Sequence, residues 1–372
     1  MKKLLIASAV SAALAAPTVA LAQAARAPTL GQVLDASGIS VNGYIDAGYS
    51  HADRNIETGT GVSTRVFDSQ NNSFALHQFG LSVSKLPKEG FGGLVNVTVG
   101  SDAQVIHSFP EGAGGSMFDV TQAYAQYSGG PLTLIAGKFA TLQGTEVIWS
   151  PSNANVSRSI LFGAIPFTHT GVRATWALSD TVSLIAGVNN GWDQLTDRNR
   201  DKTVELGATL NPIKPLNIAI SGYSGKEPAP LPTSASSGTR TSINATGSYS
   251  ITDAISVGAE VLSVSQDVPV GGGATTSVKY TGVAGYGSYT FTRKLRGALR
   301  VENFDDKDGA KFGVAGTKYR EVTATGAYLA ADNFEARAEL RRDQASNQVF
   351  RDYQGAPSKT LMTIALQGLY KF

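Results

Sequence analysis

The sequence contains no cysteine, few charged residues and, beyond its first two dozen residues, no long apolar run. Without cysteine the protein can form neither disulfides nor thiolate metal sites, and it has no thiolate nucleophile. A helical membrane protein is excluded, because each membrane-spanning helix needs about 20 mostly apolar residues. Charged residues make up only 16% of a chain rich in glycine, serine, threonine, valine and tyrosine, a composition that favours strands over helices.

The first residues have the pattern of a secretory signal. Lys2 and Lys3 precede an apolar run over 4–14, and small residues then occupy the positions that a signal peptidase reads. We predict a signal peptide over 1–24, cleaved near residues 22–24. A transmembrane anchor is disfavoured, because the apolar run is short, rich in alanine and followed by a proline.

The exported chain is close to neutral. Without Lys2 and Lys3, 29 basic residues face 29 acidic ones. A neutral, exported protein is a poor binder of polyanions, so a nucleic-acid partner is not expected.

Apolar and polar residues alternate with a period of two in many segments, which is typical of half-buried strands. The clearest examples are 39–49, 93–99, 182–188, 204–210, 295–302, 334–341 and the C-terminal 361–372.

The connections between these segments alternate between short turns and long polar loops. The long ones are expected at 52–72, 102–117, 143–167, 193–201, 227–238, 267–276, 305–318 and 346–359. Alternation places all short turns at one end of a sheet and all long loops at the other. We count about 16 strands of roughly 10–13 residues, with 14 or 18 left open, which is the signature of an outer-membrane barrel.

A soluble β-sandwich is the alternative fold, but its outer faces would carry many charges. Here the polar faces are built from serine, threonine, asparagine and glycine, and charges are sparse until the last strands. The sequence therefore predicts an all-β protein with one transmembrane antiparallel β-barrel over 38–372. A short periplasmic segment, 25–37, is expected before it.

The C-terminal strand keeps its alternation to the last residue. In a closed barrel the first and last strands must pair, so the chain is expected to end as a full strand. Tyr370 and Phe372 would then face lipid in the aromatic belt. An aromatic two residues before a terminal phenylalanine also resembles the assembly signal of Gram-negative outer-membrane barrels, so the barrel-assembly machinery is an expected partner.

Two stretches resemble the OmpL-like β-barrel porins, namely LTLIAGKFATLQGTEVI (132–148) and NANVSRSILFGAIPFTHTGVRATW (153–176). The matching motifs are Gly137-Lys138-Phe139, Gly144-Thr145-Glu146, Asn155-Val156-Ser157-Arg158-Ser159 and Pro166-Phe167-Thr168-His169-Thr170-Gly171. The resemblance implies an outer-membrane protein that forms a channel, and it names no solute.

The loop 143–167 follows the fifth expected strand. In general porins, which this chain resembles in strand count, that loop folds into the lumen and narrows it. Glu146 and Arg158, with Lys138 beside them, would then line the constriction. Charged residues of late strands are expected to face it, namely Arg296, Arg300, Glu302, Glu335, Arg337, Glu339 and Arg341.

Two roles are open for these charges. A carboxylate opposite an arginine ladder creates a transverse field that favours polar solutes. The same residues could instead form ion pairs that brace the barrel wall. Polar residues near the loop are expected to pin it by hydrogen bonds, because a loop in the lumen must satisfy its backbone polar groups. These are Asn153, Asn155, Ser157 and His169.

Catalysis is not expected. Among four histidines no pair has metal-ligand spacing on a helix, and no Gly-x-Ser-x-Gly motif occurs. The acidic run 305–308 could bind calcium weakly, but a solvated loop explains it better. We therefore predict no enzyme activity, no cofactor and no metal.

The sequence thus predicts an outer-membrane porin, a water-filled channel for passive diffusion of small hydrophilic solutes. A largely plugged barrel with a structural or surface-interaction role is the alternative. Outer-membrane lipid and lipopolysaccharide are expected partners. A homotrimer is left open, as are the solute, the ion preference and gating.

Overall fold

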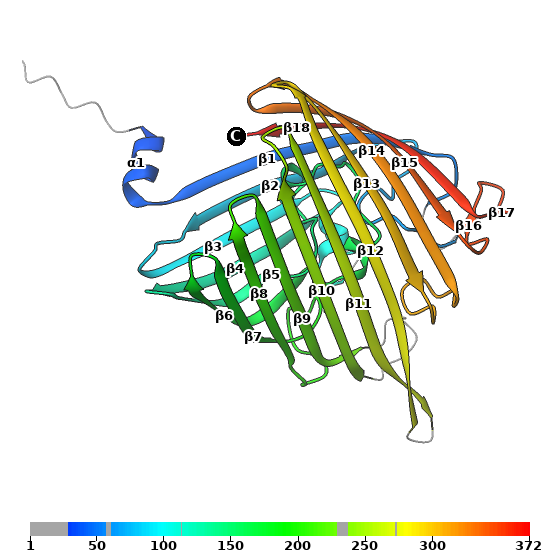
Figure 1. Cartoon of the computed structure of the whole chain (residues 1–372), viewed down its shortest axis with the longest axis horizontal. Helices are drawn as coiled ribbons and strands as arrows, with labels where there is room; N and C mark the ends of the chain where they lie inside the picture. The colour runs from blue at the N-terminus through cyan, green and yellow to red at the C-terminus, as the bar shows by residue number, and fades with distance from the viewer. Residues whose placement is uncertain (1–28, 57–60, 113, 229–236, 272–273) are drawn as a thin grey trace, which may run out of the picture. The chain divides into compact units, whose positions relative to one another are not determined.

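The chain forms a closed β-barrel (Figure 1). This structure, a computed structural model, describes residues 29–372 except 57–60, 113, 229–236 and 272–273. The signal peptide predicted over 1–24 lies outside the described residues. No described helix is long and apolar enough to cross a membrane.

In the described part of the chain, sixteen strands make up the barrel, as predicted, and each pairs antiparallel with its neighbours in sequence. They are β1 (Ser40–Ala52), β2 (Ser73–Lys85), β3 (Gly90–Val99), β4 (Phe118–Gly129), β5 (Leu132–Ala140), β6 (Thr168–Ser179), β7 (Val182–Asn189), β8 (Thr203–Ile213), β9 (Leu216–Pro228), β10 (Ser237–Ser250), β11 (Ile255–Gly271), β12 (Ala274–Thr292), β13 (Leu295–Asp306), β14 (Thr317–Ala331), β15 (Phe334–Ala345) and β18 (Thr360–Lys371).

The remaining elements are short. The loop between β15 and β18 holds a two-stranded hairpin, β16 (Phe350–Arg351) and β17 (Pro357–Ser358). The loop between β3 and β4 holds α2 (Ala103–Ile106), and the loop between β5 and β6 holds two 3-10 turns, η1 (Ser150–Ser152) and η2 (Phe162–Ala164).

The segment before the barrel is a unit of its own and contains α1 (Leu30–Ser37). Its first turn is a capping box, since Thr29 and Gln32 exchange backbone-to-side-chain hydrogen bonds of 2.9 and 3.3 Å. The sequence analysis did not predict this helix.

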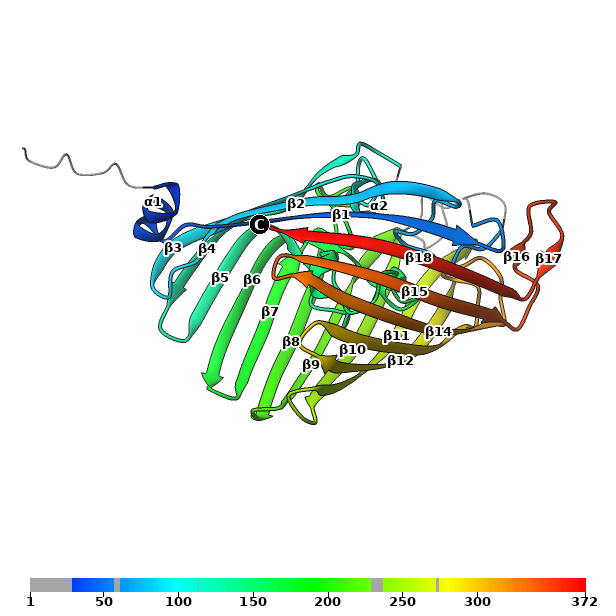
Figure 2. The same cartoon turned by 90° about the horizontal axis from the view of Figure 1, so that it is seen from above.

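The barrel closes where the first strand meets the last. Figure 2 shows β1 and β18 side by side, and the register pairs Tyr44 with Lys371 and Ala52 with Thr363. Closure leaves no unpaired sheet edge. An unpaired edge would expose backbone N–H and C=O groups to the hydrocarbon of a bilayer, where they have no partner. The strict alternation of the C-terminal strand is therefore explained by its position at the seam.

The outer face of the barrel is apolar. On β18 the side chains of Met362, Ile364, Leu366 and Tyr370 point outward, while Thr363 and Gln367 between them are buried inside. Tyr370 thus lies on the outward face of β18, and its place in an aromatic belt stays a prediction.

The barrel wall is much taller on one side than on the other. The strands β5 and β7 have 9 and 8 residues, whereas β11 and β12 have 17 and 19. The long loop predicted at 267–276 is wrong. β11 and β12 continue to pair over 267–271 and 274–277, and residues 272–273 lie outside the described part of the chain. Val268, Val270 and Thr275 are β-branched and suit a ladder that extends beyond the other strands.

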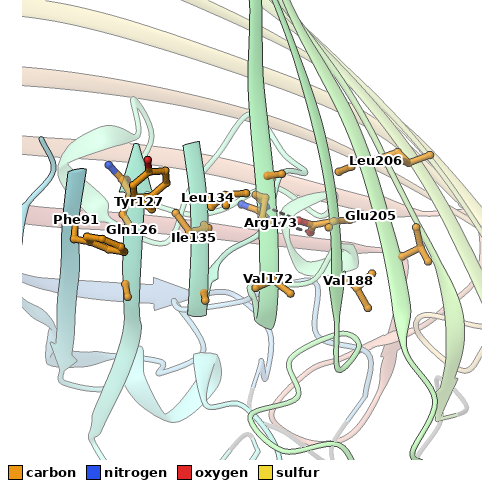
Figure 3. A pocket seen from close by; sticks show the side chains of 16 residues that line it. Phe91, Gln126, Tyr127, Leu134, Ile135, Val172, Arg173, Val188, Glu205 and Leu206 are labelled. Carbon is orange, nitrogen blue, oxygen red and sulfur yellow. Dashed lines mark hydrogen bonds and ion pairs between the residues drawn. The ribbon is translucent and has the colours of Figure 1, made fainter. Parts of the chain in front are cut away.

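The low wall carries a groove of about 630 Å³ on its outer surface, shown in Figure 3. Phe91, Leu134, Val172, Val188 and Leu206 line it. Alanines from four neighbouring strands form its floor, namely Ala125, Ala136, Ala174 and Ala186. Short side chains between large ones thus produce a depression in the apolar belt.

We expect Leu299→Arg on β13 to lower the free energy of unfolding by about 2–4 kcal/mol, because the charge would lie at mid-depth in lipid. Leu295→Arg is the matched control, since Leu295 has the same outward face and similar exposure (44% against 49%) but lies beside a short turn. It should cost about 0–1 kcal/mol. Urea unfolding in lipid vesicles measures both, and equal costs would contradict a bilayer around this face.

Candidate functional site

The loop between β5 and β6 runs through the interior of the barrel. Its first residues hydrogen-bond to inward side chains of three successive strands. Leu142 N–H donates to the Tyr223 hydroxyl (2.9 Å), Gly144 N–H to Asn244 Oδ1 (3.1 Å) and Thr145 N–H to Glu260 Oε2 (2.8 Å). The segment 141–167, which we call the infolded loop, therefore crosses from β5 to the wall formed by β9–β11.

The middle of the infolded loop reaches the seam side of the barrel. Gln78 on β2 donates to the Ile148 carbonyl (2.9 Å), and Trp149 Nε1 donates to Asn96 Oδ1 on β3 (3.0 Å). The loop thus has contacts on opposite sides of the lumen.

Two glutamates of the late strands each hold a pair of consecutive loop amides. Glu339 accepts hydrogen bonds from the N–H groups of Val156 (2.6 Å) and Ser157 (2.9 Å). Glu302 accepts them from Ile160 (2.8 Å) and Leu161 (3.1 Å). Hydrogen bonds to a carboxylate are roughly twice as strong as neutral ones, so these pairs fix the loop against β13 and β15.

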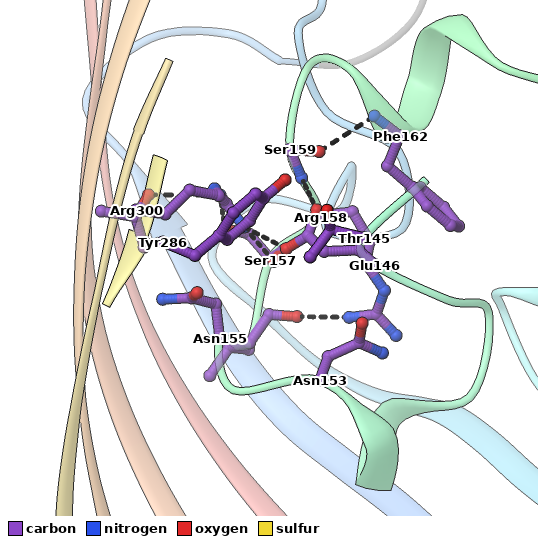
Figure 4. Close-up of polar contacts among 12 residues, drawn as sticks. Thr145, Glu146, Asn153, Asn155, Ser157, Arg158, Ser159, Phe162, Tyr286 and Arg300 are labelled. Atoms are coloured by element: carbon purple, nitrogen blue, oxygen red, sulfur yellow. Dashed lines mark hydrogen bonds and ion pairs between the residues drawn. The ribbon is translucent and has the colours of Figure 1, made fainter. Parts of the chain in front are cut away.

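Arg300 connects the loop to the wall by its charge (Figure 4). Its Nη1 lies 2.7 Å from Glu146 Oε1 and donates to the Ser157 carbonyl at 2.8 Å. On the wall it pairs with Glu321 at 3.1 Å. The second Glu146 oxygen accepts the Ser159 N–H at 2.6 Å. The sequence prediction that Glu146 faces an arginine of the late strands matches this geometry.

Arg158 and Arg341 also contact the loop backbone. Arg158 donates to the carbonyls of Val147, Ile148 and Val156 at 2.9–3.1 Å. Arg341 donates to the Arg158 carbonyl at 2.5 Å. Both side chains are almost fully buried. These contacts are hydrogen bonds to the loop backbone, so both the transverse field and the bracing of the wall by ion pairs stay predictions.

Of the other charged candidates, Arg337 reaches the infolded loop, where it donates to the carbonyls of Ser150 and Asn155 at 3.4 Å, and Lys138 does not join this network. Lys138 pairs with Asp119 on β4 at 3.2 Å, and no ion pair joins it to the late-strand charges among the described residues. Near the short-turn end of the barrel, Glu335 Oε1 lies 2.8 Å from Arg296 and 2.5 Å from Arg337.

The residues expected to pin the loop make hydrogen bonds, although their role in pinning stays a prediction. Asn153 bonds within the loop to Val147 and Trp149 at 2.8–2.9 Å. Asn155 donates to Thr325 (2.7 Å). His169 lies 3.1 Å from the Gly191 carbonyl and stacks on the Tyr223 ring.

Three residues that hold the loop are not predicted from the sequence, namely Tyr223, Asn244 and Glu260. Glu321 and Asp343, the wall partners of Arg300 and Arg341, are not predicted either. Glu260 offered the best signal, because it is the one charged residue in the first ten residues of β11, ISVGAEVLSV. Its partner, Thr145, is 115 residues away in sequence.

An apolar cluster fills part of the barrel interior. Phe67 from the loop between β1 and β2 packs against Phe162 of the infolded loop, with ring centroids 5.7 Å apart. Leu161 of the infolded loop and Phe304 on β13 are fully buried in the same cluster. The interior next to β11–β15 is therefore packed like a protein core.

Polar cavities remain on the short-turn side of the infolded loop. One of about 350 Å³ lies between the loop and β10–β13, where Ser248, Ser256 and Ser288 line it. Another of about 390 Å³ lies beside β1 and β2, where Asn42, Ser82 and Lys371 share its lining with the aromatic rings of Trp149 and Phe372. Within the described ranges no group of three or more histidine or acidic side chains could hold a metal ion.

Known proteins were compared with the chain. The model of the family "Putative beta-barrel porin-2, OmpL-like" matches residues 38–372. No curated protein shows significant sequence similarity to the chain.

Solved structures similar to the chain include outer-membrane proteins and porins. The channel DcaP of Acinetobacter baumannii has a TM-score of 0.64 at 14% identity, covering 90% of this chain and 97% of its own. The trimer form of OmpT of Vibrio cholerae has a TM-score of 0.62 at 11% identity, with coverages of 90% and 99%. The anion-selective porin from Comamonas acidovorans has a TM-score of 0.62 at 9% identity, with the same coverages.

Asp193, in the loop between β7 and β8, caps the end of the infolded loop and gives a pH-dependent test. Its Oδ1 accepts the N–H groups of Phe167 (2.8 Å) and Thr168 (2.9 Å). Burial raises the pKa of this carboxyl to about 6, against the opposing effect of those two hydrogen bonds.

Because the folded pKa lies above the unfolded one, the stability from protonated Asp193 is complete below about pH 4 and is lost as the pH rises to about 6. We expect Asp193→Asn to remove about 1–3 kcal/mol of pH dependence between pH 4 and 7 relative to wild type. Urea unfolding in detergent across this range measures it. Identical pH profiles of unfolding for the two proteins would contradict a raised pKa of Asp193 in the folded state.

Proposed function

Since the chain belongs to the OmpL-like beta-barrel porin-2 family, we propose that it is a water-filled channel for passive diffusion of small hydrophilic solutes. Family membership establishes an outer-membrane channel protein. The observation that carries the finer proposal is the pair of polar cavities beside the infolded loop. Solutes would pass beside the loop, where hydroxyl and amide groups replace their lost hydration.

We further propose that the infolded loop narrows the passage. Its amides and carbonyls are held on opposite walls by Gln78, Glu260, Glu302 and Glu339. A loop fixed at both sides of the lumen would keep a constant cross-section, which a free loop would not.

A largely plugged barrel is the second candidate, and the apolar cluster inside the barrel favours it. Phe67, Leu161 and Phe304 exclude water from their part of the lumen. In a plugged barrel the two cavities would not belong to a continuous water path across the membrane.

Electrical recording of the purified protein in planar bilayers distinguishes the two. A channel gives stepwise conductance, and liposomes containing it swell in small sugars. A plugged barrel gives neither, although it keeps the heat-modifiable gel mobility of a folded barrel.

Glu339→Gln tests the narrowing. The amide retains one acceptor and turns an NH2 group toward a loop N–H, so docking should weaken by about 1–3 kcal/mol and conductance should increase. Glu227→Gln is the matched control, because Glu227 holds the Trp192 N–H in a different loop. Unchanged conductance in Glu339→Gln would argue against narrowing by this loop.

For localisation we propose export by the signal peptide 1–24, with the short turns on the periplasmic side. Tyr370 and Phe372 lie outward at the end of β18, with ring centroids 6.1 Å apart. This position supports a role in lipid contact and in recognition by the barrel-assembly machinery. Lipopolysaccharide would contact the opposite end of the outer face.

We also propose a homotrimer that packs through the low wall. The groove over β4–β8 offers a depression into which large side chains of a second copy could fit. Short strands let neighbouring barrels approach, since less wall must be buried.

Ala174→Trp would fill that groove, so we expect it to convert trimers to monomers in mild detergent. Ala324→Trp is the control, because Ala324 lies outward on β14 in the opposite wall. Light scattering of the detergent-solubilised proteins measures the mass. A wild-type monomer, or a trimer that survives Ala174→Trp, would contradict this interface.

A further inference from the structure

Most of the charged side chains that face the lumen are neutralised by a partner. Arg300 lies against Glu146 and Glu321, and Arg341 lies against Asp343 at 2.7 Å. The carboxylates of Glu302 and Glu339 are occupied by loop amides. At mid-height of the barrel, these charged residues of β13 and β15 therefore present little uncompensated charge to a solute.

The short-turn end of the same wall is different. Arg296 on β13 and Arg337 on β15 both form ion pairs with the Glu335 carboxylate, and Lys371 on β18 lies close enough to attract it without an ion pair. Arg296 reaches Glu335 across β14 because the inward residue between them, Ala327, is small and buried. Against these three cations stand two anions, Glu335 and the α-carboxylate of Phe372 beside Lys371, so a smaller positive excess remains at this end.

Arg337 accounts for the charge of Glu335. Its side chain is almost fully buried, and its Nε lies 2.5 Å from Glu335 Oε1. The other groups near it are neutral, namely the carbonyls of Ser150 and Asn155 and the side-chain oxygen of Gln367, at 3.3–3.4 Å. Glu335 is thus already needed to compensate a buried guanidinium.

Arg296 and Lys371 are then the accessible cations at this end. The Arg296 side chain is 35% exposed, and its Nε has no hydrogen-bond acceptor among the described residues. Lys371 is exposed, borders the 390 Å³ cavity, and its ammonium pairs with no carboxylate in the described part of the chain. The adjoining turns do not cancel the excess, since they add Arg293 and Lys294 against Asp332.

We propose that Arg296 and Lys371 form an anion site beneath the infolded loop, which takes small carboxylate or phosphate anions in transit. The inference rests on the proposed channel and gives its solute class. An oxyanion would accept from the exposed part of the Arg296 guanidinium, whose side chain is 35% accessible, and from the Lys371 ammonium. Neutral groups of the cavity, such as Asn42 and Ser82, would complete its hydration shell.

The test is the reversal potential of the full mature protein in planar bilayers under a KCl gradient. Wild type should prefer chloride. Arg296→Gln with Lys371→Gln should lower the chloride-to-potassium permeability ratio about two- to fourfold, because two charges leave the path. The control pair, Lys318→Gln with Lys359→Gln, removes the same charge at the long-loop end and should leave the ratio nearly unchanged.

Inorganic phosphate provides the second measurement. Added on the short-turn side, it should reduce the chloride current of wild type and of the control pair, but not of Arg296→Gln with Lys371→Gln. Heat-modifiable mobility verifies that each variant is folded. If Arg296→Gln with Lys371→Gln conducts, but its chloride-to-potassium permeability ratio and its block by phosphate equal those of wild type, this inference alone is overturned. A protein without conductance overturns the proposed channel as well.

Discussion

The constraint on which the rest of the structure depends is that a 27-residue segment inside a barrel must find partners for its backbone polar groups. The wall supplies them with charged side chains. Glutamates accept N–H groups in consecutive pairs, and arginines donate to carbonyls. This arrangement explains why charge is concentrated on the inner faces of β13–β15. Those faces need strong donors and acceptors more than they need solubility.

The same constraint limits what the charges can do for a solute. A carboxylate that accepts two loop amides contributes less to the field in the lumen than a free one, and Arg300, enclosed by Glu146 and Glu321, has its charge balanced locally. Toward the short turns Arg337 donates to the loop carbonyls of Ser150 and Asn155, whereas no hydrogen bond from Arg296 or Lys371 to the loop is present in the described part of the chain.

Strand number, strand order and the outward face of β18 were predictable, because lipid and lumen impose opposite polarity on alternate residues over the whole chain. The contact between Glu146 and an arginine of the late strands was also predictable, since the loop follows the fifth strand. The partners Tyr223, Asn244 and Glu260 were not, because they depend on the path of the loop across the lumen. The length of the β11–β12 hairpin was missed because glycine and proline near 267–276 imitate a loop.

The interior is uneven in polarity, and this bears on how a barrel can be both firmly packed and permeable. Near β11–β15 the infolded loop buries Leu161 and Phe162 against Phe304 and Phe67, which anchors it by apolar contact as well as by charge. Toward the short turns the loop presents Ser152 and Thr145 to polar cavities instead. A loop anchored on one face can leave its other face to water without losing its position. The apolar cluster thus need not oppose a channel, because it supplies the rigidity that a fixed constriction requires.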